Sequence, residues 1–399
     1  TSEFAMHEMW SRRFQPHATS KRWMAARIDR QYKEVYDIIH PLQQVAAPRN
    51  VRTAPYHQRL LEQGAHFHAA AGWEVAHWYA ANAHLVDEYD DRIPHRTGWE
   101  AMNWSRIQGA EHLALRDKVG LYNIANFAKF TVSGAGALGF LNRMAANDID
   151  KPVGRIVYTA LCDRAGGIKA DLTITRTGES TFLVLTGAST GPADLAWLRL
   201  HAPRDGSVVI ADHTSRTTGV ALWGPRARLV LQQVADQPVD NAANPYFTAR
   251  PVTIGTVPAL ALRLSYAGEL GWEIYCPSEY GLNLWDTLWE AGQPHGLFAL
   301  GGGAFNSLRV EKGYRAVGAE LTTEYNPYEA GLGFAVRLNQ GDFLGRAALA
   351  RAKATGPIRR LCCVTSDDPD AMALGKEPVL HGDQAVGYLT SVDYGYSVG

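Results

Sequence analysis

Residues 155–176 read RIVYTALCDRAGGIKADLTITR, and they carry the clearest signal of the fold. Two apolar runs, 155–162 and 170–175, flank the segment Asp163-Arg-Ala-Gly-Gly167, which has the composition of a turn. Strand, tight turn and strand in direct succession predict an antiparallel hairpin, because a parallel pair needs a crossover of a dozen or more residues. We therefore expect a sheet that is not built from parallel β-α-β units.

The segment upstream, Gly134-Ala-Gly136-Ala-Leu-Gly139, matches the GxGxxG fingerprint of dinucleotide-binding proteins. It follows the strand-like run 129–133 and opens the helix-like run 137–146, and Asp163 comes after the next strand, so its local context also agrees. The predicted hairpin contradicts the parallel winding that the fingerprint requires. A nicotinamide-dependent enzyme is therefore the least favoured of the candidate functions.

The remaining strands and helices mix without strict alternation, which favours the α+β class. Helices are predicted at 225–235, 279–291, 304–312 and 346–353, and a strand at 252–266. Residues 1–105, rich in Trp, Tyr, His and Arg, predict an N-terminal arm of short helices, one of them at 56–72. Residues 106–345 contain the mixed central domains. Residues 346–399, which are strand and turn beyond Gly356-Pro357, predict a small C-terminal β module that is cut short.

Composition excludes several classes of function. The chain has 39 Lys+Arg and 40 Asp+Glu, a net charge of −1, so it lacks the basic field that binds nucleic acid or an anionic membrane. It contains no run of about 18 consecutive apolar residues of the kind that spans a bilayer. Its four cysteines are scattered, so neither a disulfide framework nor a zinc site is expected. The expected compartment is the cytoplasm.

Fourteen histidines raise the question of a metal centre. His66 and His68 are two positions apart, which in a helix places them on different faces. No HExxH motif or carboxylate triad accompanies them. We therefore expect hydrogen-bonded or surface histidines and no metal.

Two acidic residues are candidates for a functional site. Asp171 follows the glycines of the turn and begins an apolar strand, where a carboxylate can face a cleft and have its pKa changed by it. The alternative is an exposed aspartate at a strand end. Glu273 lies between Trp272 and the apolar residues 274–276, so a partner for its charge is expected. That partner is either a ligand or an arginine of the protein, and the sequence leaves both open.

These stretches resemble the aminomethyltransferase (glycine-cleavage T-protein) family, and most closely the folate-binding C-terminal half of dimethylglycine oxidase and sarcosine dehydrogenase. The resemblance covers most of the chain and rests on several motifs in order: 146–150 (ANDID), 154–158 (GRIVY), 165–171 (AGGIKAD), 266–273 (YAGELGWE), 307–315 (SLRVEKGYR), 320–323 (ELTT), 329–333 (EAGLG) and 343–349 (FLGRAAL). It implies a three-domain cloverleaf around a central channel that holds tetrahydrofolate. The C-terminal module would then be barrel-like.

The resemblance also implies roles for single residues. Asp171 is similar to the aspartate beside the reactive folate nitrogens, where it would be the catalytic base. Tyr158 and Tyr266 are similar to aromatic residues that line the pterin site, and Glu273 to the carboxylate that binds the pterin ring. There are departures from the family: Phe305-Asn306 stand where T-proteins carry Arg-Asp, and Asn123 and Ala125 stand where the family usually has Asp and Ser.

The function implied is an enzyme that captures the formaldehyde or iminium carbon of an N-methyl amine, such as dimethylglycine or sarcosine, as 5,10-methylenetetrahydrofolate. Two alternatives stay open. One is a tetrahydrofolate-dependent O-, N- or S-demethylase that yields 5-methyltetrahydrofolate, and the other is a folate-binding module without catalysis. Residues 36–78 resemble the closing segment of a flavin domain, and relatives continue beyond residue 399. We therefore expect the folate half of a larger system with a flavin oxidoreductase domain or subunit.

Overall fold

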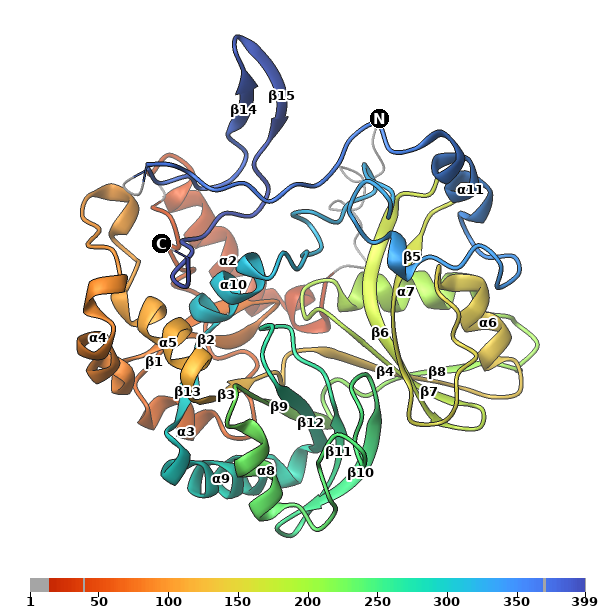
Figure 1. Ribbon diagram of the computed structural model, residues 1–399, viewed down its shortest axis with the longest axis horizontal. Helices are drawn as coiled ribbons and strands as arrows, with labels where there is room; N and C mark the ends of the chain where they lie inside the picture. The colour runs from red at the N-terminus through yellow and green to blue at the C-terminus, as the bar shows by residue number, and fades with distance from the viewer. Residues whose placement is uncertain (1–13, 39, 369–370, 399) are drawn as a thin grey trace.

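The computed structural model describes residues 14–38, 40–368 and 371–398, and two sheets form its body (Figure 1). The first has five strands in the order β5 (Ile156–Cys162), β6 (Ile168–Gly178), β7 (Thr181–Thr186), β4 (Ala128–Ser133) and β8 (Val209–Asp212). The second has six in the order β10 (Ala249–Ile254), β11 (Val257–Leu262), β12 (Gly271–Pro277), β9 (Thr217–Trp223), β3 (Val119–Asn123) and β13 (Leu297–Leu300). Every neighbouring pair in them is antiparallel except β13 and β3, so the expected α+β class is confirmed.

The predicted hairpin is present as β5 and β6, which pair from Ile156↔Thr175 to Cys162↔Ile168. In its turn the backbone N–H of Gly167 donates to Asp163 Oδ1 at 2.9 Å, and Gly166 has φ +89°. The GxGxxG segment has a packing role: a Cβ on Gly134 would come within 2.3 Å of the Ser207 carbonyl oxygen. Since β4 is antiparallel to both of its neighbours, the dinucleotide alternative has no structural support.

Helices cover one face of the five-stranded sheet and both faces of the six-stranded sheet (Figure 1). The five-stranded sheet packs its apolar side chains against α6 (Ala137–Met144) and α7 (Gly191–His201). The six-stranded sheet packs against α8 (Ala227–Val234) and α9 (Gly281–Gly292). A separate apolar cluster lies on its opposite face and includes residues of α5 (Arg106–Asp117) and α10 (Gly302–Glu311). Among these elements, α5, α7, β3 and β13 were not predicted from the sequence.

Two local predictions were wrong. The helix expected at 56–72 is α3 (His57–Glu62), followed by a hairpin of β1 (Ala65–Ala70) and β2 (Trp73–Tyr79). Glycines with φ of +68° and +80°, Gly64 and Gly72, end the helix and turn the hairpin. The strand expected at 252–266 is divided into β10 and β11 by a turn at Gly255, where φ is +56°.

The N-terminal arm is helical at α2 (Lys21–Glu34), α3 and α4 (His84–Glu88), but it also takes part in the main core. Tyr56, Leu60 and Tyr79 are fully buried in the cluster beneath the six-stranded sheet. Their burial explains why this segment has few long apolar runs: single large side chains fill a core that other segments complete. No helix in the described part of the chain is long and apolar enough to cross a membrane.

The C-terminal segment has little regular structure. After α11 (Arg346–Thr355), the structure has no strand in residues 357–368, where one was expected. A hairpin of β14 (Pro378–His381) and β15 (Gln384–Tyr388) projects from the body with mostly exposed side chains (Figure 1). The chain then returns to α10, where Asn306 Nδ2 donates to Asp393 Oδ2 at 2.7 Å.

Candidate functional site

Asp171 and Tyr158 come together on the β5–β6 hairpin. Ala170 and Leu172 point into the core beneath α6 and α7, so the alternation of strand side chains turns Asp171 to the opposite face. There the Tyr158 hydroxyl donates a hydrogen bond of 2.9 Å to Asp171 Oδ2. Burial raises the pKa of Asp171 to about 6, although the bond from Tyr158 acts to lower it. The alternative of an exposed strand-end aspartate is therefore wrong.

Tyr266 belongs to the same site. Its hydroxyl donates to the carbonyl oxygen of Arg315, and its ring packs 5.6 Å from Phe305 and 5.2 Å from Tyr314. Burial raises the pKa of Tyr266, and the negative charge of Asp171 raises it further. Tyr266 is therefore linked to Asp171 by charge and not by a hydrogen bond or ring contact among the described residues, whereas Tyr158 contacts Asp171 directly.

Glu273 lies on the second sheet, in β12, where it pairs with Leu262 and Ala221. Only 5% of its surface is exposed, and it faces the same side of the strand as Tyr275, whose hydroxyl donates to Glu273 Oε2 at 2.7 Å. Burial raises the pKa of Glu273 to about 7. Glu273 makes no ion pair with any described residue, so the alternative of a salt bridge to an arginine is not supported.

The structure shows no direct contact between Glu273 and Asp171, but one apolar cluster links the surroundings of Glu273 to Tyr266. Tyr275, whose hydroxyl donates to Glu273, is buried in this cluster, and Tyr266 packs against it. Within it, Phe305 of α10 stacks on Tyr122 at 4.9 Å and on Trp223 at 5.7 Å. The departure from the T-protein pattern at residue 305 therefore adds an aromatic ring next to Tyr266.

The second departure also has a structural account. Asn123 Oδ1 accepts from the hydroxyl of Tyr56 at 2.8 Å and from the backbone N–H of Ala125 at 3.0 Å. Asn123 thus holds the loop after β3 and links it to the N-terminal arm. Local hydrogen bonding at this position is satisfied without the carboxylate that the family usually has.

Two buried ionisable residues near these strands were not predicted. Lys129 of β4 is fully buried, its Nζ donates to the carbonyl oxygens of Ala125 at 2.8 Å and Phe127 at 2.7 Å, and burial lowers its pKa to about 7. Asp194 of α7 accepts from Thr186 Oγ1 at 2.6 Å, and burial together with the charge of Asp171 raises its pKa to about 7. The sequence contained a signal for each buried residue: Lys129 lies inside an apolar strand, and Asp194 lies in the first turn of a helix.

The histidines of the N-terminal hairpin lie in a strand and not in a helix, so the prediction that His66 and His68 occupy different helix faces was wrong. Their ring centroids are 5.8 Å apart, and His68 stacks on His77 at 3.9 Å. Burial lowers the pKa of His68 to about 3 and that of His77 to about 4, so both rings are neutral. In the described part of the chain no group of His, Cys, Asp or Glu side chains has the arrangement of a metal site.

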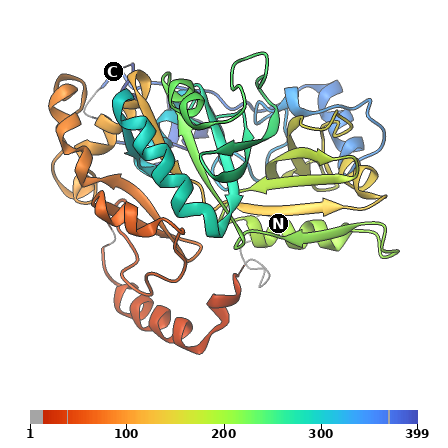
Figure 2. The same cartoon turned by 90° about the horizontal axis from the view of Figure 1, so that it is seen from below.

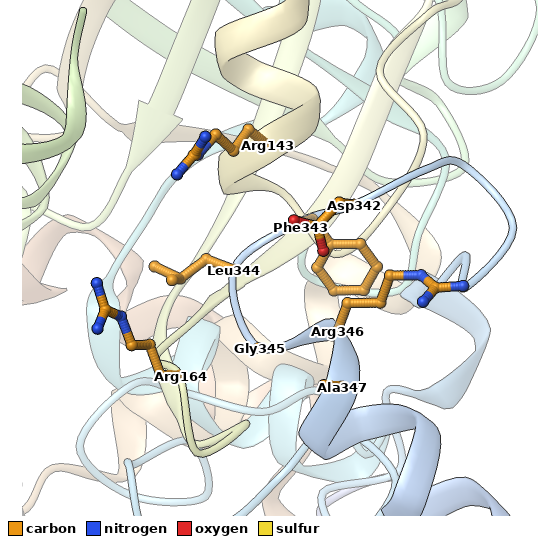
Figure 3. A pocket seen from close by; sticks show the side chains of 8 residues that line it. All are labelled: Arg143, Arg164, Asp342, Phe343, Leu344, Gly345, Arg346 and Ala347. Carbon is orange, nitrogen blue, oxygen red and sulfur yellow. The ribbon is translucent and has the colours of Figure 1, made fainter.

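A surface pocket of about 240 Å³ lies away from these residues (Figure 3). Arg143, Arg164 and Arg346 line it together with Asp342 and with Leu344, which lies between the first two arginines in this view. None of Tyr158, Asp171, Tyr266 or Glu273 is among its lining residues. The pocket is therefore separate from the site that the sequence predicted.

Three family models match the chain. The GCVT N-terminal domain matches residues 56–340, which is more than half of the chain. The glycine cleavage T-protein C-terminal barrel domain matches residues 359–399, and the FAD dependent oxidoreductase central domain matches residues 1–54.

Curated relatives include both oxidases and transferases. The chain is 35% identical to 4-methylaminobutanoate oxidase (formaldehyde-forming) of Paenarthrobacter nicotinovorans, over 97% of this chain and 46% of that protein. It is 33% identical to mitochondrial dimethylglycine dehydrogenase of Rattus norvegicus, over 85% and 39%. It is 36% identical to the aminomethyltransferase of Geobacillus thermodenitrificans, over 74% and 80%. The chain thus spans less than half the length of the first two relatives.

A solved structure is also similar. It is the glycine cleavage system aminomethyltransferase T from Bartonella henselae, with a TM-score of 0.64 and 25% identity. The match covers 77% of this chain and 76% of that one. The similarity therefore extends over most of both folds and not over one motif.

Proposed function

The chain belongs to the glycine cleavage T-protein family of aminomethyltransferases, and on this basis we propose that it transfers a one-carbon unit to tetrahydrofolate. The carbon is the formaldehyde or iminium carbon of an N-methyl amine, and the product is 5,10-methylenetetrahydrofolate. The observation that carries the proposal is the Tyr158–Asp171 pair. It holds a carboxyl with a pKa of about 6, which influences Tyr266 electrostatically and has no ion-pair partner among the described residues.

Tetrahydrofolate fits the residues that are present. A pterin ring has an amino group and a ring N–H side by side, and a carboxylate can accept both hydrogen bonds. Glu273 is a buried carboxyl whose donor in the described structure is Tyr275, so two further donors would stabilise its charged form. The aromatic cluster around Phe305 and Tyr266 supplies apolar surface for a flat ring.

Bound tetrahydrofolate would supply two amine nitrogens, each of which forms one bond to the carbon. The two protons that these nitrogens lose both end on the carbonyl oxygen, which leaves as water, and Asp171 accepts a proton in its charged form and returns it to that oxygen in its protonated form. Formaldehyde and the folate thus give methylene-folate and water, with no net oxidation. The Tyr158 hydroxyl holds the carboxyl in place, and the negative charge of Asp171 stabilises positive charge that develops as water departs.

An N-methyl amine yields this carbon only after it loses two electrons, so the proposal requires an oxidant. We propose a flavin-dependent oxidoreductase as the partner that removes them. Two observations support this choice. Residues 1–54 match an FAD dependent oxidoreductase domain, and the oxidase relative named above forms formaldehyde.

The test combines binding and turnover. Calorimetry should detect tetrahydrofolate binding and no NAD binding, and absence of folate binding would refute the proposal. Asp171→Asn should retain folate affinity but lower one-carbon transfer on the order of 100-fold, the usual scale for a positioned acid or base. The exposed Asp236→Asn serves as the control. Formation of 5-methyltetrahydrofolate would favour the demethylase alternative, and binding without turnover would favour a non-catalytic module.

A further inference from the structure

Phe334 is an exposed aromatic residue close to Asp171. It lies in the 3-10 helix η8 (Gly333–Ala335), and 62% of its surface is exposed. Its ring stacks on that of Tyr158, with the ring centroids 6.2 Å apart and the planes inclined by 19°. Tyr158 in turn donates to Asp171, so one side chain separates Phe334 from the carboxyl. No step of the proposed reaction uses Phe334.

The backbone that carries Phe334 is fixed to the rest of the protein. On either side of it, Leu332 and Val336 are buried in an apolar cluster against which Tyr158 packs. The Arg337 side chain donates to the carbonyl oxygen of Phe334 at 2.8 Å. Figure 2 shows that the segment after α10, which contains η8, and helix α7 lie on opposite sides of the five-stranded sheet. The turn is thus held against the face of the sheet that carries Asp171.

The same loop is joined to Tyr266. Arg315 Nε donates to the carbonyl oxygen of Ala330 at 3.0 Å, and the carbonyl oxygen of Arg315 accepts from the Tyr266 hydroxyl. Gly331 has φ +70°, and a Cβ there would come within 2.3 Å of Arg315 Nη2, so glycine is required for this close approach. A short series of contacts therefore connects the loop that carries Phe334 to Tyr266.

The Phe334 ring has apolar surface available to a ligand, because stacking on Tyr158 covers only part of it. Single exposed apolar side chains are common, so exposure alone does not indicate a function. Here the exposed ring is nearly parallel to a second aromatic ring, and that second ring is hydrogen-bonded to the carboxyl of Asp171. Flat aromatic groups pack favourably on rings of this kind.

We propose that Phe334 packs on the aminobenzoyl ring of tetrahydrofolate and is a binding residue for that part of the molecule, an inference that rests on the proposed function. In tetrahydrofolate one of the two reactive nitrogens belongs to the pterin, and the other is bonded to the aminobenzoyl ring. With the pterin at Glu273 and the reactive nitrogens at Asp171, the aminobenzoyl ring extends from the neighbourhood of Asp171. Phe334 supplies exposed aromatic surface in that neighbourhood.

The test compares tetrahydrofolate with 6-methyltetrahydropterin, which has the pterin but lacks the aminobenzoyl ring. Tetrahydrofolate affinity is measured by calorimetry, and 6-methyltetrahydropterin affinity by displacement of tetrahydrofolate. Phe334→Ala should weaken tetrahydrofolate binding about tenfold, the scale of one lost aromatic contact, and change 6-methyltetrahydropterin binding by less than about twofold. Phe334→Tyr keeps the ring and should bind both ligands as the parent does. The matched control Leu200→Ala shortens an apolar side chain of α7 that is also 62% exposed, and should leave both affinities unchanged.

Two results with a parent protein that binds tetrahydrofolate would overturn the role of Phe334 alone. Unchanged tetrahydrofolate affinity in Phe334→Ala would show that the ring does not contact the substrate. Equal weakening of both ligands would show that Phe334 supports the site as a whole, through Tyr158, and does not contact the aminobenzoyl ring. Absence of tetrahydrofolate binding by the parent would overturn the proposed function together with this inference. Circular dichroism confirms that each variant is folded.

Discussion

Removal of the Tyr158 hydroxyl should move the pH dependence of one-carbon transfer. In Tyr158→Phe, Asp171 loses the 2.9 Å hydrogen bond to Oδ2 that favours its charged form. A hydrogen bond to a charged group contributes about 1.5 to 3 kcal/mol, and one pKa unit corresponds to about 1.36 kcal/mol. The pKa of Asp171 should therefore rise from about 6 by about one to two units.

The effect on rate has a definite sign. A base acts in its charged form, and at pH 7 a carboxyl with a pKa of about 6 is mostly charged. With the raised pKa, the charged fraction and hence the rate at pH 7 should fall roughly two- to tenfold. The rate should recover as the pH approaches 9, because the carboxyl is again deprotonated there. Loss at neutral pH with recovery in base is the signature of this mechanism.

The assay follows 5,10-methylenetetrahydrofolate from pH 5.5 to 9, with the spontaneous condensation at each pH subtracted. Tyr280→Phe, a hydroxyl removed from the turn before α9, controls for a general effect of the substitution. A variant whose rate is lower by the same factor at every pH would contradict this mechanism. In that case Tyr158 would act by another route, and Asp171 would not be the group that titrates in the rate.

Three further predictions concern binding and stability. Glu273→Gln should weaken tetrahydrofolate binding by about 2 to 3 kcal/mol in calorimetry, because one carboxylate oxygen that would accept from the pterin is replaced by an NH₂ donor. Unchanged folate affinity together with a less stable protein would assign Glu273 a structural role. Glu111 of α5 accepts hydrogen bonds from two backbone N–H groups and from the side-chain amide of Asn82, so Glu111→Leu leaves three buried donors unpaired. Urea unfolding should show that the free energy of unfolding falls by about 3 kcal/mol or more, and a smaller decrease would contradict this account. Burial raises the pKa values of Asp171, Glu273, Asp194 and Glu111 to between about 6 and 8, so the folded state binds protons more tightly than the unfolded state. Between pH 8 and about 6.5, where histidine is mostly neutral in both states, the free energy of unfolding should therefore rise as the pH falls, against a smaller opposing contribution from Lys129. Below that range the lowered pKa values of His68 and His77 act in the opposite direction. A profile that falls as the pH is lowered from 8 to about 6.5 would show that these carboxyls are less shifted.

Local sequence was sufficient for the elements whose signals lie within a few residues. The β5–β6 hairpin follows from two apolar runs around a glycine-containing turn, and the helices α6, α8, α9, α10 and α11 follow from their apolar periodicity. The register, which only the structure gives, pairs Tyr158 with Thr173 and Ala160 with Asp171, so Tyr158 and Asp171 are diagonal neighbours on this hairpin. The order of motifs along the chain also indicated the family, because several of them occur in the expected sequence.

Tertiary packing alone determined which side chains are buried and which distant segments share a site. Tyr266 bonds to a carbonyl 49 positions away, and Phe305 of α10 reaches Tyr122 of β3. Burial of Lys129 and Glu111 depends on segments that the local pattern does not contain, and so do their shifted pKa values. The β1–β2 hairpin escaped prediction because the alanines of β1 favour a helix, and pairing with β2 across the turn selected the strand. Short-range patterns specify backbone conformation, whereas desolvation and long-range contacts exist only once the chain is packed.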